Sequence, residues 1–179
     1  MMVLWYISRA TGLVSLALFT ATLVLGLLTA GRFAAAGLPR FAVQRLHRNL
    51  SLLSLAFLVV HVVSAVSDGY VEIGLVDAVV PFASAYDPFW LGLGAVAFDL
   101  LLAVLITSLL RTRLPLEVWR GVHLASYASW PVALVHGFAM AGDDTAWVLG
   151  FDVVCVAAAA GALLWRTTRL HPDTPVRTP

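Results

Sequence analysis

Four histidines stand in strongly apolar stretches of the sequence and form two pairs of similar spacing. His47 and His61 are 14 residues apart, and His123 and His136 are 13 residues apart. Imidazole is costly to bury in lipid without a partner, so histidines in membrane segments are candidates for functional sites. If each stretch is a helix, the two histidines of a pair lie about 20 Å apart along its axis. Two neighbouring helices of this kind would offer one pair of facing imidazoles at each of two levels.

Rotation along each helix decides whether the histidines of a pair share a face. Fourteen residues fall about 40° short of four full turns, so His47 and His61 point the same way. Thirteen residues fall about 140° short, and an ideal helix would turn His123 and His136 apart. Pro131 lies between them and can kink or unwind the helix. Alignment of the second pair therefore requires a distortion of this helix.

Two imidazoles at each level match the needs of a haem iron, which takes axial ligands on opposite faces of a flat ring. Zinc requires four ligands close together, and each level offers two. The simpler alternative is that each histidine only hydrogen-bonds a neighbouring helix. Four histidines at paired levels favour haem over that alternative. The single cysteine, Cys155, excludes a disulfide framework and a cysteine-rich zinc or iron–sulfur site.

The composition requires a membrane around these histidines. The 179-residue chain is 61% hydrophobic and 12% charged, whereas soluble domains are about half apolar and about 25% charged. This excludes a soluble globular enzyme and a disordered chain. Five stretches are long enough to cross about 30 Å of hydrocarbon as helices; they lie near residues 10–30, 46–66, 89–110, 120–140 and 146–165. We therefore expect an all-α membrane protein, a bundle of five transmembrane helices, with an interfacial segment in the outer loop at residues 67–88.

Arginine distribution predicts the orientation of the chain. Ten of the eleven arginines fall in the first loop, the third loop and the tail, which are on one side if there are five spans. Cytoplasmic loops carry such an excess, so we expect a multi-pass protein of the cell membrane with its N-terminus outside. His47 and His123 then share the inner level, and His61 and His136 the outer level. Residues 1–165 form the membrane domain, and residues 166–179 form a polar cytoplasmic tail.

A cleaved signal peptide within the first 36 residues is the alternative for the first span. We reject it because no positive charge precedes Arg9 and the apolar core, about 19 residues, is long for a signal. The net charge of +1 favours no particular partner, and nucleic acid is not expected.

Four arginines are candidates for contacts with haem propionates, since guanidinium matches carboxylate geometry. Arg45, Arg48 and Arg120 stand within three residues of the inner histidines, although arginine is also expected at cytoplasmic span ends. Arg9 is the only arginine on the predicted outer side, at the level of His61 and His136, and Asp152 is a rival partner for it.

One aromatic and three small residues complete the predicted site. Trp130 falls midway between His123 and His136, where it could lie between two rings; filling the core is the alternative. Ser54 is seven residues from both His47 and His61 and is small enough to make room for a porphyrin. Gly12 and Gly26, 14 residues apart in the first span, could admit the ring edges, although small residues also serve ordinary helix packing.

The histidine spacing resembles that of the ferric reductase-like transmembrane domain family. This family includes the membrane part of NADPH oxidases and ferric reductases, and the haem-binding subunit of a periplasmic methionine sulfoxide reductase system. The resemblance covers roughly residues 6–165, and the segment YISRATG near the N-terminus looks like the opening of bacterial stand-alone members. It implies two b-type haems, with His47 and His123 on the inner iron and His61 and His136 on the outer iron.

The resemblance also implies electron transfer from a cytosolic flavin or a quinol, through both haems, to an extracytoplasmic acceptor. Larger members carry a flavin and nicotinamide domain after the last span, and no G-x-G-x-x-G fingerprint occurs here. The chain is therefore expected to be a haem-dependent oxidoreductase subunit, with FAD only on a partner reductase. Two alternatives remain open: a cation or proton transporter lined by histidine and aspartate, and a non-redox membrane assembly subunit.

Overall fold

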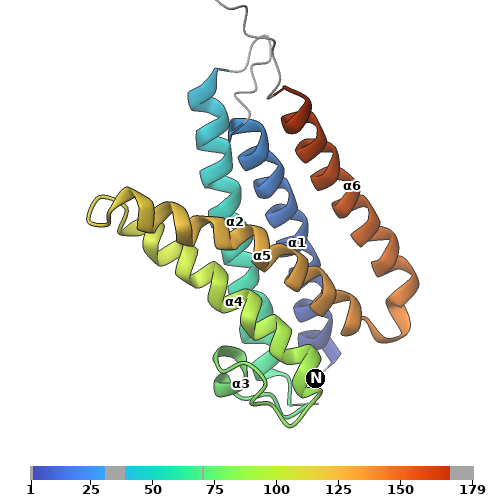
Figure 1. Ribbon diagram of the computed structural model, residues 1–179. Helices are drawn as coiled ribbons and strands as arrows, with labels where there is room; N and C mark the ends of the chain where they lie inside the picture. The colour runs from blue at the N-terminus through green and yellow to red at the C-terminus, as the bar shows by residue number, and fades with distance from the viewer. Residues whose placement is uncertain (1, 31–38, 70, 170–179) are drawn as a thin grey trace, which may run out of the picture.

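The computed structural model describes residues 2–30, 39–69 and 71–169, and these residues are helical throughout apart from the connecting turns. The helices are α1 (Met2–Ala30), α2 (Arg40–Ser67), α3 (Leu75–Val79), α4 (Pro88–Leu109), α5 (Leu116–Ala139) and α6 (Thr145–Arg169), with the 3-10 turn η1 (Gly142–Asp144) between the last two. The prediction of an all-helical membrane protein is confirmed, and Figure 1 shows the arrangement.

Four stretches are long and apolar enough to cross a membrane: Val3–Ala30, Phe41–Ser67, Pro88–Leu109 and Gly142–Thr168. Four of the five predicted spans are therefore confirmed as candidate spans. The fifth corresponds to α5, a continuous helix of 24 residues. The polar residues of α5 are spread along the whole helix, from Glu117 to His136, and leave no long apolar window, whereas the charged residues of α2 are gathered in its first third.

Two helical hairpins position the histidines. In Figure 1, α1 and α2 lie side by side, and the α4–α5 pair crosses in front of them. Helix α6 packs on α1 and α5, and α3 packs mainly against α4. Within the described residues, α2 and α5 are not among the closely packed helix pairs. The two helices that carry the histidines, α2 and α5, are therefore not in close backbone contact with each other.

The segment predicted to be a loop with an interfacial segment, residues 67–88, contains a short helix and a set of turns among its described residues. The five-residue helix α3 lies at the end of the bundle where α1 begins (Figure 1). Pro88 occupies the first turn of α4, where a missing N–H costs no helical hydrogen bond. Gly142 has φ +58 in the turn after α5, a left-handed conformation that glycine adopts without strain.

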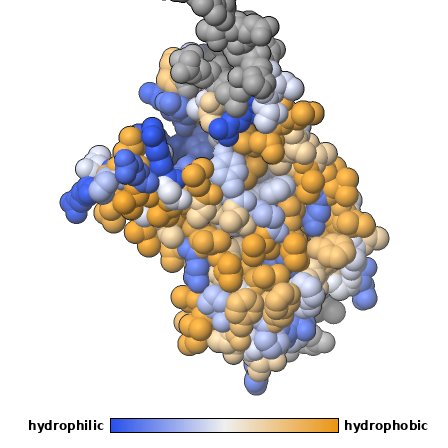
Figure 2. Space-filling model, in the orientation of Figure 1, coloured by the Kyte–Doolittle hydropathy of each residue, from blue (hydrophilic) through white to orange (hydrophobic). Residues whose placement is uncertain are grey.

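Two small hydrophobic clusters hold α6 against the rest. Leu23 and Leu27 of α1 pack with Ala159 and Ala162 of α6, and a second cluster joins Leu16, Leu134 and Cys155. Most other large apolar side chains point outwards; only 11% of the α2 candidate span is buried. Figure 2 shows this apolar surface over much of the visible face of the bundle. Lipid is the medium that such a surface requires.

Candidate functional site

The four histidines of α2 and α5 meet in two pairs. The rings of His47 and His123 have centroids 6.4 Å apart, and those of His61 and His136 are 6.5 Å apart. Each pair joins α2 to α5 across the gap between the two hairpins. The pairs are those expected from the sequence, and α5 reaches both levels with Pro131 inside the helix.

The ring separations fit one metal ion between each pair. A metal–imidazole bond of about 2.0 Å, with about 1.1 Å from nitrogen to ring centroid, sets collinear ligands roughly 6.2 Å apart between centroids. The observed 6.4 and 6.5 Å are close to this separation. No group of three or more histidine, cysteine or acidic side chains suited to a metal ion occurs among the described residues. Each level thus offers two imidazole ligands among the described residues.

Backbone carbonyls fix the orientation of three of the four rings. Nδ1 of His47 lies 3.1 Å from the Thr22 carbonyl oxygen, and Nδ1 of His61 lies 2.7 Å from that of Ser8. Nδ1 of His136 lies 2.8 Å from the carbonyl oxygen of Trp90. A carbonyl only accepts, so each Nδ1 carries the proton and donates it. Each Nε2 then keeps its lone pair, which is the state that a metal ligand requires.

These contacts form part of a regular ladder between α1 and α2. At the rung between the two histidines, Ser54 Oγ donates to the Ser15 carbonyl at 2.9 Å, and Ser15 Oγ donates to the Ser54 carbonyl at 3.0 Å. The α2 residues of the three rungs are seven residues apart. Seven residues are close to two helical turns, so one face of α2 binds one face of α1. Ser54 therefore sets the register of this hairpin and is buried within it.

A shorter ladder joins α5 to α4. Ser129 Oγ donates to the Ala97 carbonyl at 3.0 Å, seven residues before the rung made by His136 and Trp90. Ser129 is fully buried. Sequence reasoning missed this residue, and its signal was its spacing of seven from His136, the same step that separates Ser54 from its two histidines.

Glycines make room for three of the histidine rings. A Cβ at Gly12 would meet His61 Nδ1 at 2.8 Å, and a Cβ at Gly94 would meet His136 Cε1 at 2.6 Å. At Gly26 the nearest atom, His47 Cε1, is 3.5 Å away. Each glycine stands four residues after the carbonyl that its histidine binds. The first-span glycines thus lie against the ligand rings themselves, and Gly94 is a site residue that sequence reasoning did not single out.

The outer histidine pair lines a cavity of about 1190 Å³, a volume that includes space open to the exterior. Its lining comes from all six helices or their turns and is mainly apolar, with Arg9 and Asp77 among the polar residues. The cavity therefore presents mainly apolar walls beside His61 and His136, as ligand pockets commonly do.

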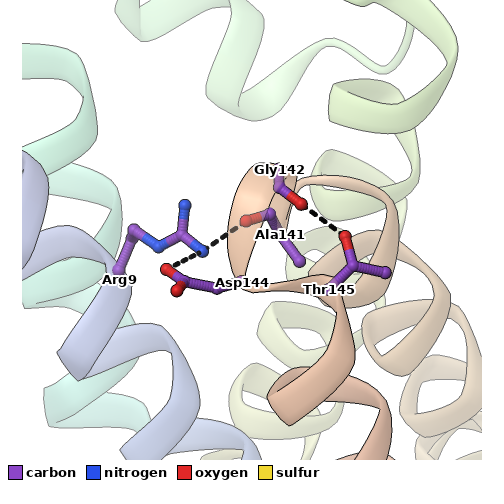
Figure 3. Close-up of polar contacts among 5 residues, drawn as sticks. All are labelled: Arg9, Ala141, Gly142, Asp144 and Thr145. Carbon is purple, nitrogen blue, oxygen red and sulfur yellow. Dashed lines mark hydrogen bonds and ion pairs between the residues drawn. The ribbon is translucent and has the colours of Figure 1, made fainter.

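Arg9 reaches from α1 to the turn between α5 and α6 (Figure 3). Its Nη2 donates to the Ala141 carbonyl at 2.5 Å and lies 3.0 Å from Asp144 Oδ2. Its guanidinium also stands 4.5 Å from the ring centroid of Trp5. Its acidic partner is therefore Asp144; Asp152 Oδ1, by contrast, is buried without a hydrogen-bond partner. Arg9 lines the outer cavity together with His61 and His136.

The three inner arginines are exposed side chains. Arg45 stands over the ring of Phe41 with 5.8 Å from Cζ to the centroid, one turn away on α2. Arg48 and Arg120 are exposed beside the inner histidine pair along their own helices. Their predicted contact with propionates stays a prediction.

Trp130 packs on the α1 and α6 side of α5. Its Nε1 donates to Thr20 Oγ1 at 2.9 Å, and its ring contacts both hydrophobic clusters of the bundle. This indole ties α5 to α1 at the level between the two histidine pairs. Its predicted place between two haem rings stays a prediction.

A family model described as "ferric reductase like transmembrane component" matches residues 11–135. The matched region contains His47, His61 and His123 and ends one residue before His136. No curated protein and no solved structure gave a significant match. The match extends over well more than half of the chain and covers most of both hairpins, so the chain belongs to the ferric reductase-like transmembrane component family.

Proposed function

We propose that this chain is a diheme b-type membrane subunit that moves electrons from a cytoplasmic or quinol donor to an extracytoplasmic acceptor. The family implies transmembrane electron transfer, and the observation that carries the haem assignment is the pairing of four histidines. Three of their Nδ1 atoms donate to carbonyls, and the paired rings are spaced for one iron between them. His47 and His123 would hold the inner haem, and His61 and His136 the outer haem.

In this proposal α5 is a fifth membrane-embedded helix, and the N-terminus of the chain lies outside. The arginine distribution supports this orientation through the positive-inside rule. Arg45, Arg48, Arg111, Arg113 and Arg120 are all exposed at one end of the bundle, and Asp68, Glu72, Asp77, Asp87, Asp143 and Asp144 belong to the turns at the other end. Figure 2 shows the hydrophilic surface at the turn between α4 and α5.

The residues of the chain would bind and orient the two haems and keep water away from them. Bound haem supplies a one-electron redox centre at each level. The carbonyl-bound Nδ1 atoms hold three imidazoles in the ligating tautomer and make them more basic ligands. The apolar walls around His61 and His136 lower the local dielectric and so help to set the potential of the outer centre. An electron moving outwards gains about 2.3 kcal/mol per 100 mV of inside-negative membrane potential.

The donor in this proposal is a separate protein carrying FAD or a membrane quinol. The exposed arginines at the inner end form a positively charged surface that an acidic reductase could approach. A ferric chelate, oxygen or a redox protein outside the membrane would take the electron from the outer haem.

A visible difference spectrum and a haem count on the purified protein test the proposal. We expect reduced-minus-oxidised bands of b-type haem and two haems per chain. A folded protein without these bands would overturn the proposal. Cation or proton flux through liposomes containing such a colourless protein would then favour a transporter.

Replacement of Arg9 by glutamine tests its predicted contact with the outer haem. Loss of a cation beside the outer haem destabilises the reduced state, so the midpoint potential of that haem is expected to fall. Asp144→Asn is the matched control, because it breaks the same ion pair but removes a negative charge. A redox titration that gave the two variants the same negative shift would assign Arg9 only to holding the α5–α6 turn.

A further inference from the structure

The inner histidine of α5 differs from the other three. Nδ1 of His123 is buried and has no hydrogen-bond partner, whereas the other three Nδ1 atoms bind backbone carbonyls. The ladder between α4 and α5 therefore lacks the rung that its counterpart between α1 and α2 possesses at His47.

The spacing of the histidines explains the missing rung. Steps of seven residues from His136 lead to Ser129 and then to Val122, so His123 is one residue out of step. On α4 the same step from Trp90 and Ala97 leads to Val104. The carbonyls of Ala103 and Val104 accept from Thr107 Oγ1 at 2.8 and 3.2 Å. At this level the position on α5 that faces α4 is Val122, which has no imidazole. The facing carbonyl of α4, that of Val104, already accepts a hydrogen bond from Thr107 of the same helix.

A ring stack orients His123 instead. The indole of Trp119, one turn away on α5, lies parallel to its ring, with centroids 5.0 Å apart and planes 22° apart. The guanidinium of Arg111 also contacts this indole, with Cζ 4.6 Å from the ring centroid of Trp119. Trp119 Nε1 has no hydrogen-bond partner, so its ring contacts and not its N–H determine how it sits. Arg111, Trp119 and His123 therefore form one column that ends at the inner histidine pair.

We propose that this column makes the two haem sites unequal: the inner iron has one weakly held axial ligand, His123, and Trp119 is the residue that positions it. This inference rests on the proposed function. A histidine that donates Nδ1–H to a carbonyl is a more basic ligand and favours the oxidised iron. His123 lacks that bond and has the Arg111 cation on its column, and both features favour the reduced iron. The inner haem is thus the one with the higher potential and the exchangeable ligand.

The first measurement is a redox titration of the wild-type protein, followed by carbon monoxide binding to the reduced form. We expect two separate one-electron transitions and carbon monoxide binding to one haem, the haem of higher potential. Absence of b-type haem would overturn the proposed function itself. Two haems with one shared potential, or carbon monoxide binding to the haem of lower potential, would overturn only the inequality.

The second measurement compares variants of Trp119 and Arg111. It follows the inner haem, and the outer haem of the same protein is the internal control. Trp119→Leu removes the stack, and carbon monoxide binding to the inner haem is expected to become about tenfold faster while the outer haem keeps its potential. Trp119→Phe retains an aromatic ring and is expected to behave as wild type. Trp147→Leu, an exposed indole at the other end of the bundle, is the matched control for loss of a tryptophan.

Arg111→Gln separates the charge from the stack. We expect it to lower the potential of the inner haem alone, whereas Arg113→Gln, an exposed arginine in the same turn, leaves that potential closer to wild type. If Trp119→Leu lost haem altogether, comparison of Arg111→Gln with Arg113→Gln would still test the inequality of the two haems, because both variants keep the indole of Trp119. Equal shifts of both haems in Arg111→Gln, or shifts confined to the outer haem, would contradict the assignment of the column to the inner site.

Discussion

Replacing His61 by alanine is expected to remove one of the two haems and leave the other. The ring of His61 faces only His136 across the gap, and the two rings are spaced for a single iron. An iron that loses one of two axial histidines loses half of its protein bonds, so retention of the outer haem through purification is not expected. The measurement is the haem-to-protein ratio, together with the b-type absorbance per chain.

Double replacements test the pairing itself. Because His61 and His136 serve the same iron, His136→Ala and the double variant should show the same loss as His61→Ala. His61→Ala combined with His123→Ala should remove both haems, because these residues belong to different pairs. Such non-additivity is the signature of groups that act as one unit. A double variant of His61 and His136 that lost more haem than either single variant would contradict the pairing.

Two further variants distinguish loss of an iron ligand from misfolding as the cause of haem loss. His171→Ala, a change in the polar tail, should retain both haems. His61→Gly leaves a space that free imidazole can enter, and added imidazole should restore the outer haem. A protein that bound no haem in any histidine variant and did not respond to imidazole would indicate that the bundle assembles only with both haems present.

The sequence predicted the two levels of histidines because spacing along a helix translates directly into height and rotation. The one difficulty was the pair on α5, since an ideal helix turns His123 and His136 apart. The structure pairs both with α2, with Pro131 inside the helix. The helix α5 is continuous through Pro131. His136 is part of the ladder with α4, and His123 is not.

Other features were beyond sequence reasoning because they depend on helix packing. The small size of Gly12 and Gly26 suggested room for a porphyrin, but which atoms fill that room depends on the register of α1 against α2. That register is set by Ser15 and Ser54, and it places the glycines against imidazole rings. The partner of Arg9 was likewise set by the turn at Gly142, which brings Asp144 Oδ2 to 3.0 Å from the Arg9 guanidinium.

Adding a side chain at Gly94 is expected to have the second largest effect on haem content. A Cβ there would stand 2.6 to 2.9 Å from three ring atoms of His136, which is closer than non-bonded atoms approach. The ring is held by its bond to the Trp90 carbonyl, one turn before Gly94 on α4, so it cannot retreat without breaking that bond. Gly94→Ala should therefore displace His136 and lower occupancy of the outer haem while the inner haem remains.

A graded series of glycine replacements makes this prediction quantitative. Gly12→Ala places its Cβ 2.8 Å from His61 and should weaken the same outer haem, whereas Gly26→Ala meets His47 at an ordinary 3.5 Å and should retain the inner haem. Gly121→Ala is the matched control, because nothing lies within 4 Å of its added Cβ. We expect haem loss in the Gly94 and Gly12 variants and retention of both haems in the Gly26 and Gly121 variants. Equal loss in all four variants would contradict the assignment of these glycines to the histidine rings. Loss of helix stability could not explain such a result, because alanine is favoured over glycine in a helix by about 1 kcal/mol.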